Sequence, residues 1–141
     1  MRTHEETALS VASELENHPL IERVIYPGLE SHPQFALGQR QMKNTSGMMT
    51  FRLKGGLTAN QLAAEKIAKS LKVVHYAVSL GHQRSLVCWM PSASLLETSF
   101  RVDSDGESRY REWAGDGVFR LSVGLENAAD ISADLIQALT T

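Results

Sequence analysis

Apolar and polar positions along the chain follow a helical period in some segments and alternate in others. Helical spacing predicts long helices over residues 3–19, 57–72 and 127–140, and a shorter one over residues 33–42. The apolar residues that we expect on their inward faces are Ala8, Val11, Ala12 and Leu15, then Ala64, Ile67, Ala68 and Leu71, and finally Ile131, Leu135 and Leu139.

The three long segments also carry signals for where each helix begins. Thr3 with Glu6, and Thr58 with Gln61, have the spacing of capping boxes. Asn127 is placed to cap the last helix.

Strands are predicted where the pattern alternates or stays apolar over a short run. In the stretch "GMMTFRLKGG", residues 47–56, Met49, Phe51 and Leu53 share one face. Apolar runs predict further strands within residues 21–27, 73–80, 85–90 and 115–126. The polar stretch 104–117 predicts one or two exposed helical turns.

Helices and strands that alternate irregularly favour an α+β (mixed α/β) fold. We expect a small sheet of about four or five strands with helices packed on it. The chain has 141 residues, of which 43% are hydrophobic, which is enough for one core. No repeat or long linker divides it, so we expect one domain.

Composition narrows the possible partners and compartment. Fourteen basic and sixteen acidic residues are scattered along the chain, which argues against a nucleic-acid partner. No apolar stretch has the length of a membrane span, and the first residues lack a signal-peptide core, so we expect no membrane partner. The single cysteine, Cys88, lies in an apolar run and fits a core residue of a cytoplasmic protein.

Several common site motifs are missing. The five histidines have no metal-binding spacing, so we expect no metal site. Neither a glycine-rich phosphate-binding motif nor a G-x-S-x-G nucleophile motif occurs in the sequence.

Arg120 stands out because it interrupts the apolar run "GDGVFRLSVGLE", residues 115–126. An arginine is rarely buried without a partner, and its planar fork of donors matches a carboxylate. One interpretation is a structural ion pair with Glu126 or Asp116. The other is a site for a carboxylate ligand.

Ser79, Leu80 and Gly81 form a second candidate feature, at the end of an apolar run. Polar residues that are followed by glycine at a strand end often face a cleft. An ordinary junction between a strand and a turn is the alternative.

Four segments in this order resemble the C-terminal domain of the Cys/Met-metabolism enzymes, which depend on pyridoxal phosphate (PLP). These are "HPLIERVIYPGLESHPQ", "SGMMTFRLKGG", "VSLG" and "GDGVFRLSVGLENAADISADL". The resemblance covers roughly residues 4–139. It implies that residues 1–141 are the C-terminal small domain of a fold-type I PLP enzyme. Such enzymes cleave or form C–S bonds in sulfur amino acids.

The resemblance also implies a substrate-binding group made of Arg120, Ser79, Val78 and Leu80. Arg120 would hold the substrate α-carboxylate, with Ser79 beside it. Val78 stands where cystathionine enzymes tend to have a glutamate, which disfavours cystathionine as substrate. The chain departs from the family pattern at "SLGHQRS", at "WMPSASLLETSF", and in a longer connection to the arginine strand.

The catalytic lysine of this family, found in a Ser-x-Thr-Lys context, has no counterpart in the sequence. The resemblance implies that PLP belongs to a preceding domain of the full-length parent, which would be a homo-tetramer. We therefore expect no catalytic residue, no bound cofactor and no lyase activity in residues 1–141 alone. The alternative is a stand-alone, non-catalytic domain that binds an amino acid or docks on a relative, with an exposed apolar face that favours self-association.

Overall fold

The computed structural model describes residues 1–99 and 101–140. Within these residues the helices are α1 (Arg2–Glu16), α2 (Phe35–Gln41), α3 (Gly56–Ser70), α4 (Ser92–Leu96), α5 (Ser104–Ala114) and α6 (Ala128–Thr140). The strands are β1 (Ile21–Ile25), β2 (Met48–Leu53), β3 (His75–Tyr76), β4 (Leu86–Pro91) and β5 (Gly117–Ser122).

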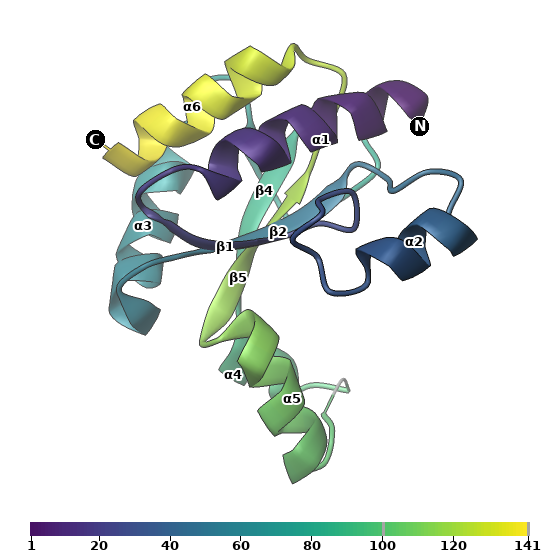
Figure 1. The fold of residues 1–141 in the computed structure, drawn as a ribbon. Coiled ribbons are helices and arrows are strands. Elements are labelled where there is room, and N and C mark those ends of the chain that lie inside the picture. Colours follow the sequence, from purple (N-terminus) through teal and green to yellow (C-terminus); the bar gives the residue numbers. More distant parts are fainter. Residues whose placement is uncertain (100, 141) are drawn as a thin grey trace.

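The five strands form one mixed sheet in the order β1-β2-β5-β4-β3 (Figure 1). Only β3 and β4 are parallel to one another, and the other neighbouring pairs are antiparallel. The strand that carries Arg120, β5, is the middle strand and is paired on both sides. The predicted α+β fold is confirmed.

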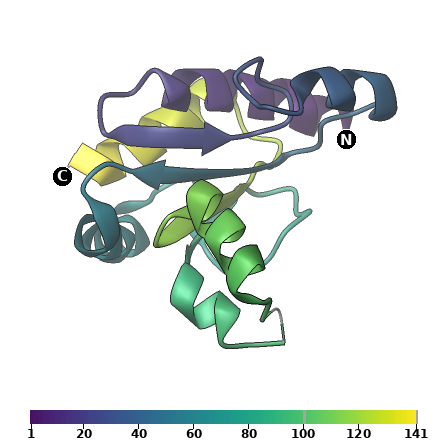
Figure 2. The same cartoon turned by 60° about the horizontal axis from the view of Figure 1, so that its bottom comes forward.

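The hydrophobic core lies between one face of the sheet and the helices α1 and α6, which run side by side across it (Figures 1 and 2). The predicted inward residues of α1, α6 and β2 are buried. At the centre of the sheet the rings of Phe51 and Phe119 stack with their centroids 5.2 Å apart. Burial of each such side chain stabilises the fold by about 1.5–3 kcal/mol.

The two predicted capping boxes are wrong, because Thr3 and Thr58 lie inside their helices rather than before them. α1 begins at Arg2, and Glu6 pairs with Arg2 at 3.1 Å instead of capping the helix. α3 begins at Gly56, directly after Gly55, whose φ of 97° starts the helix without a side-chain cap. The cap at Asn127 is confirmed, since its side-chain oxygen accepts a hydrogen bond from the Ala129 amide at 2.9 Å.

Two further predictions differ from the structure. Most of residues 73–80 do not form a strand, since β3 contains only His75 and Tyr76. The reason is that the following residues leave β4 and hydrogen-bond to side chains of β5, as described below. Ala68 is exposed, because the buried face of α3 is formed by Asn60, Ala63, Ala64 and Ile67.

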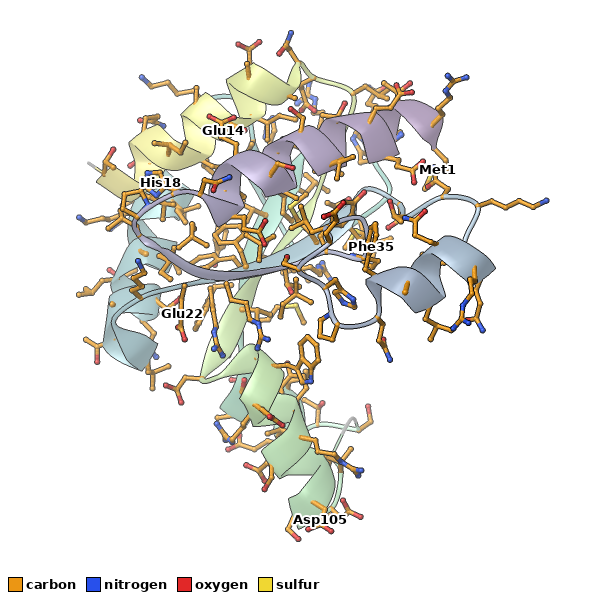
Figure 3. All side chains as sticks on the ribbon, viewed as in Figure 1. Met1, Glu14, His18, Glu22, Phe35 and Asp105 are labelled. Atoms are coloured by element: carbon orange, nitrogen blue, oxygen red, sulfur yellow. The ribbon has the colours of Figure 1, made fainter. Side chains whose placement is uncertain are left out.

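The helices α4 and α5 form an arm that projects from the side of the sheet opposite α1 and α6 (Figures 1 and 2). Asp105, near the start of α5, lies at its far end (Figure 3). α5 is longer than the one or two turns predicted. The Asp103 side chain caps it by accepting from the Gly106 amide at 2.8 Å, and Gly115, with a φ of 58°, ends it.

Candidate functional site

The candidate site is built on the face of β5 that points away from the helical core. Phe119, Leu121 and Val123 are fully buried in the core, as the alternation predicts. Arg120 and Ser122 therefore point to the opposite face. In the register of the sheet, Arg120 lies opposite Thr50 of β2 on one side and opposite Cys88 of β4 on the other.

Arg120 is partly exposed, and its Nη2 donates a hydrogen bond to the Ser79 carbonyl oxygen at 3.1 Å. The structure thus brings together the two residues that the sequence singled out. Ser79 contributes its backbone carbonyl, while its side chain is exposed.

Neither ion pair that the sequence offered for Arg120 is formed. The Glu126 carboxylate instead accepts hydrogen bonds from the amide and hydroxyl of Ser85, both at 2.8 Å. Asp116 lies 3.9 Å from Arg111. Within residues 1–99 and 101–140, no carboxylate lies within ion-pair distance of Arg120.

The segment from Ser79 to Gly81 is attached to β5 at a second point. The Gly81 amide donates to the Ser122 hydroxyl oxygen at 3.1 Å. Gly81 has a φ of 69°, a left-handed conformation that suits glycine. Val78 and Leu80 face solvent, with exposed fractions of 82% and 59%. The four predicted site residues therefore lie together at an open surface, rather than in a buried strand.

The continuation of this segment is also fixed to the chain after β5. The Ser85 hydroxyl oxygen accepts from the Gly124 amide at 2.9 Å, and the Leu125 amide donates to the Gln83 carbonyl at 2.9 Å. A Cβ at Gly124 would lie 2.4 Å from that same carbonyl oxygen. Only glycine lets the two backbones approach so closely.

Two shallow hollows flank Arg120 on this face of the sheet. One has a volume of about 260 Å³ and is lined by Ile25, Met48, Met49, Thr50 and Arg120 itself. The other has a volume of about 310 Å³ and is lined by Val78, Cys88, Trp89, Met90, Pro91, Ser94, Leu95 and Thr98. Both are mainly apolar.

Comparison with known proteins shows which family this chain belongs to. The model of the Cys/Met metabolism PLP-dependent enzymes matches residues 1–140. The chain belongs to this family. An L-methionine gamma-lyase of Pseudomonas deceptionensis is 40% identical over 139 residues, covering 99% of this chain and 32% of the relative. A cystathionine gamma-lyase of Sus scrofa is 44% identical over 141 residues, covering 99% of this chain and 32% of that protein.

The fold agrees with the same assignment. A crystal structure of cystathionine gamma synthase from Xanthomonas oryzae pv. oryzae, in complex with aminoacrylate and cysteine, superposes with a TM-score of 0.76 at 32% identity. It covers 99% of this chain, and this chain covers 34% of it. The chain thus spans about a third of the length of these family members.

The described residues do not by themselves enclose a lysine. All five lysines, Lys43, Lys54, Lys66, Lys69 and Lys72, have exposed side chains. Lys54 donates to the Pro19 carbonyl at 2.7 Å, at the surface. A Schiff base with PLP uses a desolvated lysine, and the described residues alone form no such site.

Among the described residues, no three His, Cys, Asp or Glu side chains are grouped so that they could hold a metal ion. In that part of the chain, no helix is both long and apolar enough to cross a membrane.

Three residues organise this site through contacts that the sequence did not predict; Glu126 was expected only as a possible ion-pair partner of Arg120. Ser122 and Glu126 hold the 79–85 connection, and Asp134 of α6 holds the residues before β3. The available signal was that Asp134 interrupts the inward face of an apolar helix, and that Ser122 shares the strand face of Arg120. Neither signal names a partner, because the partners lie far away in sequence.

Proposed function

We propose that residues 1–141 are the C-terminal domain of a PLP-dependent enzyme that cleaves or forms C–S bonds in sulfur amino acids, and that this domain holds the substrate α-carboxylate. The observation that carries the proposal is Arg120. It is a partly exposed arginine without a carboxylate partner among the described residues, and it lies beside Ser79. The names of the relatives, lyases and a synthase of methionine and cystathionine, support the reaction class.

The proposed role follows from the donors of the guanidinium. Arginine has five N–H donors, of which one is used on the Ser79 carbonyl. The others can form two parallel hydrogen bonds to a carboxylate. A substrate held in this way has a fixed orientation at its α-carbon, which is a requirement for directed bond cleavage. Residues outside this chain would supply the cofactor and its lysine.

Val78 supports a substrate without a charged distal group. Its side chain is exposed and borders the apolar hollow beside Arg120. A thioether side chain such as that of methionine suits this surface better than the zwitterionic end of cystathionine, because an ammonium or carboxylate group would lose hydration there without a partner.

The test is Arg120→Ala in the full-length enzyme. Loss of two charge-assisted hydrogen bonds, of roughly 1.5 kcal/mol or more each, should lower kcat/KM for the amino-acid substrate by about 100-fold or more. Steady-state kinetics measures this, and circular dichroism and Tm check the fold. The matched control is Arg109→Ala, which removes an exposed arginine of α5 and should leave kcat/KM unchanged.

Two results would contradict the proposal. If Arg120→Ala unfolds the protein, Arg120 has a structural role instead. If kcat/KM keeps its value in a folded variant, Arg120 does not hold the substrate. Independently, residues 1–141 purified alone and mixed with PLP should release no thiol from methionine or cystathionine.

A further inference from the structure

We propose that Ser122 is a positioning residue of this site: it holds the segment Ser79–Gly81 against β5 and so keeps Ser79 at the right place beside Arg120. The proposal rests on the proposed function, because it concerns how well the site binds a carboxylate.

The segment is attached to β5 at two matched points. Arg120 donates to the carbonyl of Ser79, and Ser122 accepts from the amide of Gly81, both at 3.1 Å. Arg120 and Ser122 are two positions apart on β5, as Ser79 and Gly81 are in the segment. Side chains two positions apart on a strand lie on the same face, about 6.8 Å from one another. The segment therefore lies along β5, with its ends held by neighbouring side chains of one strand face.

Apolar burial contributes little to this placement. Val78 and Leu80 are 82% and 59% exposed, so the segment has no side chain anchored in the core next to Ser79. Ser122, by contrast, is 2% exposed and belongs to the middle strand of the sheet. The hydrogen bond from Gly81 thus links the exposed segment to the middle strand of the sheet, which is paired on both sides.

This link affects Arg120 through Ser79. With the Ser79 carbonyl fixed, the guanidinium that donates to it is held in one orientation, and its free donors point in a defined direction. Without Ser122, the Gly81 amide loses its acceptor and the segment can move. Arg120 then has to be ordered when the ligand binds, which weakens binding.

The test uses Ser122→Ala in the full-length enzyme, with L-alanine as a carboxylate-bearing competitive ligand and L-alaninamide as a ligand that lacks the carboxylate. We expect the KM for the amino-acid substrate and the inhibition constant of L-alanine to rise about 5- to 10-fold, with kcat changed less than about 2-fold. The inhibition constant of L-alaninamide should stay as in the wild type. A merely structural defect would weaken both ligands.

Ser132→Ala is the matched control. Ser132 is also fully buried, on α6, and its hydroxyl has no hydrogen-bond partner among the described residues. This variant should leave both inhibition constants unchanged. If the alanine variant does not fold, Ser122→Cys serves as a second variant. Its thiol has the same connectivity as the serine hydroxyl but is a weaker acceptor, so L-alanine binding should weaken in the same direction.

The double variant Arg120→Ala, Ser122→Ala separates this proposal from the proposed function. If Ser122 acts through Arg120, the double variant should bind L-alanine no more weakly than Arg120→Ala alone. If Arg120→Ala has no effect on L-alanine, the proposed function fails. If Arg120→Ala weakens L-alanine binding but Ser122→Ala and Ser122→Cys do not, only the positioning role fails. Equal losses in Ser122→Ala and Ser132→Ala would also overturn it.

Discussion

Glu5 shows how a single residue ties distant parts of the fold together. Its carboxylate, on the first turns of α1, accepts from the backbone amide of Thr45 at 2.6 Å and from the Thr45 hydroxyl at 2.8 Å. The hydrogen bond from the Thr45 backbone amide has the larger effect and the one from the Thr45 hydroxyl the smaller. Together they hold the pKa of Glu5 below its ordinary value of 4.5. The Tyr26 hydroxyl extends this network by donating to the Ser46 carbonyl at 2.8 Å. Burial raises the pKa of Tyr26, so this hydroxyl stays protonated as a donor.

A pH dependence of stability follows at the residue scale. Because the pKa of Glu5 is lower in the folded state, its contribution is present in full above the unfolded pKa, near 4.5, and is lost as the pH falls through the folded pKa. Glu5→Gln should therefore lower stability at pH 7 and flatten the loss of stability that the wild type shows as the pH falls below about 4.5.

Urea unfolding at a series of pH values measures this dependence. Glu14→Gln removes an exposed carboxylate from the same helix and serves as the matched control. An unchanged pH dependence in Glu5→Gln would show that the network around Thr45 does not favour the ionised carboxylate.

At the scale of elements, α6 fixes where β3 begins. The buried carboxylate of Asp134 accepts from the consecutive amides of Lys72, Val73 and Val74 at 2.8–3.1 Å. Burial by itself raises the pKa of Asp134, but these hydrogen bonds and one from Gln137 outweigh it and leave the pKa below its ordinary value. The chain between the end of α3 and the start of β3 is therefore held by one side chain of a helix from the far end of the sequence.

Asp134→Ala should destabilise the fold by about 2–4 kcal/mol, because it leaves three buried or half-buried amides without their charged acceptor. The free energy of unfolding in urea measures this loss. Asp130→Ala is the control, since Asp130 is an exposed carboxylate in the first turn of the same helix, where its interaction with the helix dipole is worth about 0.3–1 kcal/mol. A loss in Asp134→Ala no larger than in Asp130→Ala would contradict this role.

At the scale of the whole molecule, the structure has a compact body and a projecting arm. α1, α6 and the sheet share one core, whereas Ala114 is the only buried residue of α5 (Figure 1). The ion pair of Arg111 with Glu107 on α5 is partly exposed and worth little. The arm is held by its caps at Asp103 and Gly115 and, at the C-terminal end of α5, by Arg52, whose Nη1 donates to the Trp113 carbonyl at 3.1 Å.

Hydrogen exchange should reveal this difference. Amides of α5 should exchange through local unfolding, at least 10-fold faster than amides of β5 and α6, because few apolar contacts stabilise α5. Exchange monitored by mass spectrometry on the intact protein measures it. Equal protection of α5 and β5 would show that the arm shares the cooperative stability of the body.

The sequence alone predicted the elements whose pattern repeats over several turns or pleats. α1 and α6 carry regular inward faces, and β2 alternates without a break, so their burial was predictable from periodicity alone. It also singled out Arg120 and Ser79, since a charge in an apolar run is conspicuous in any fold. Helix starts were predicted less well, because Thr3 and Thr58 match a capping motif that also fits the inside of a helix.

The contacts that hold the site together could be seen only in the folded protein. Gly81 and Ser122 are 41 residues apart, and Asp134 lies 60 to 62 residues from the amides of Val74, Val73 and Lys72. An apolar run such as residues 73–80 predicts burial, but it does not predict whether a neighbouring strand pairs with it. Hydrogen bonds between distant residues depend on the packing of the sheet and of α6. For that reason the residues of the site could be found in the sequence, while their positions could not.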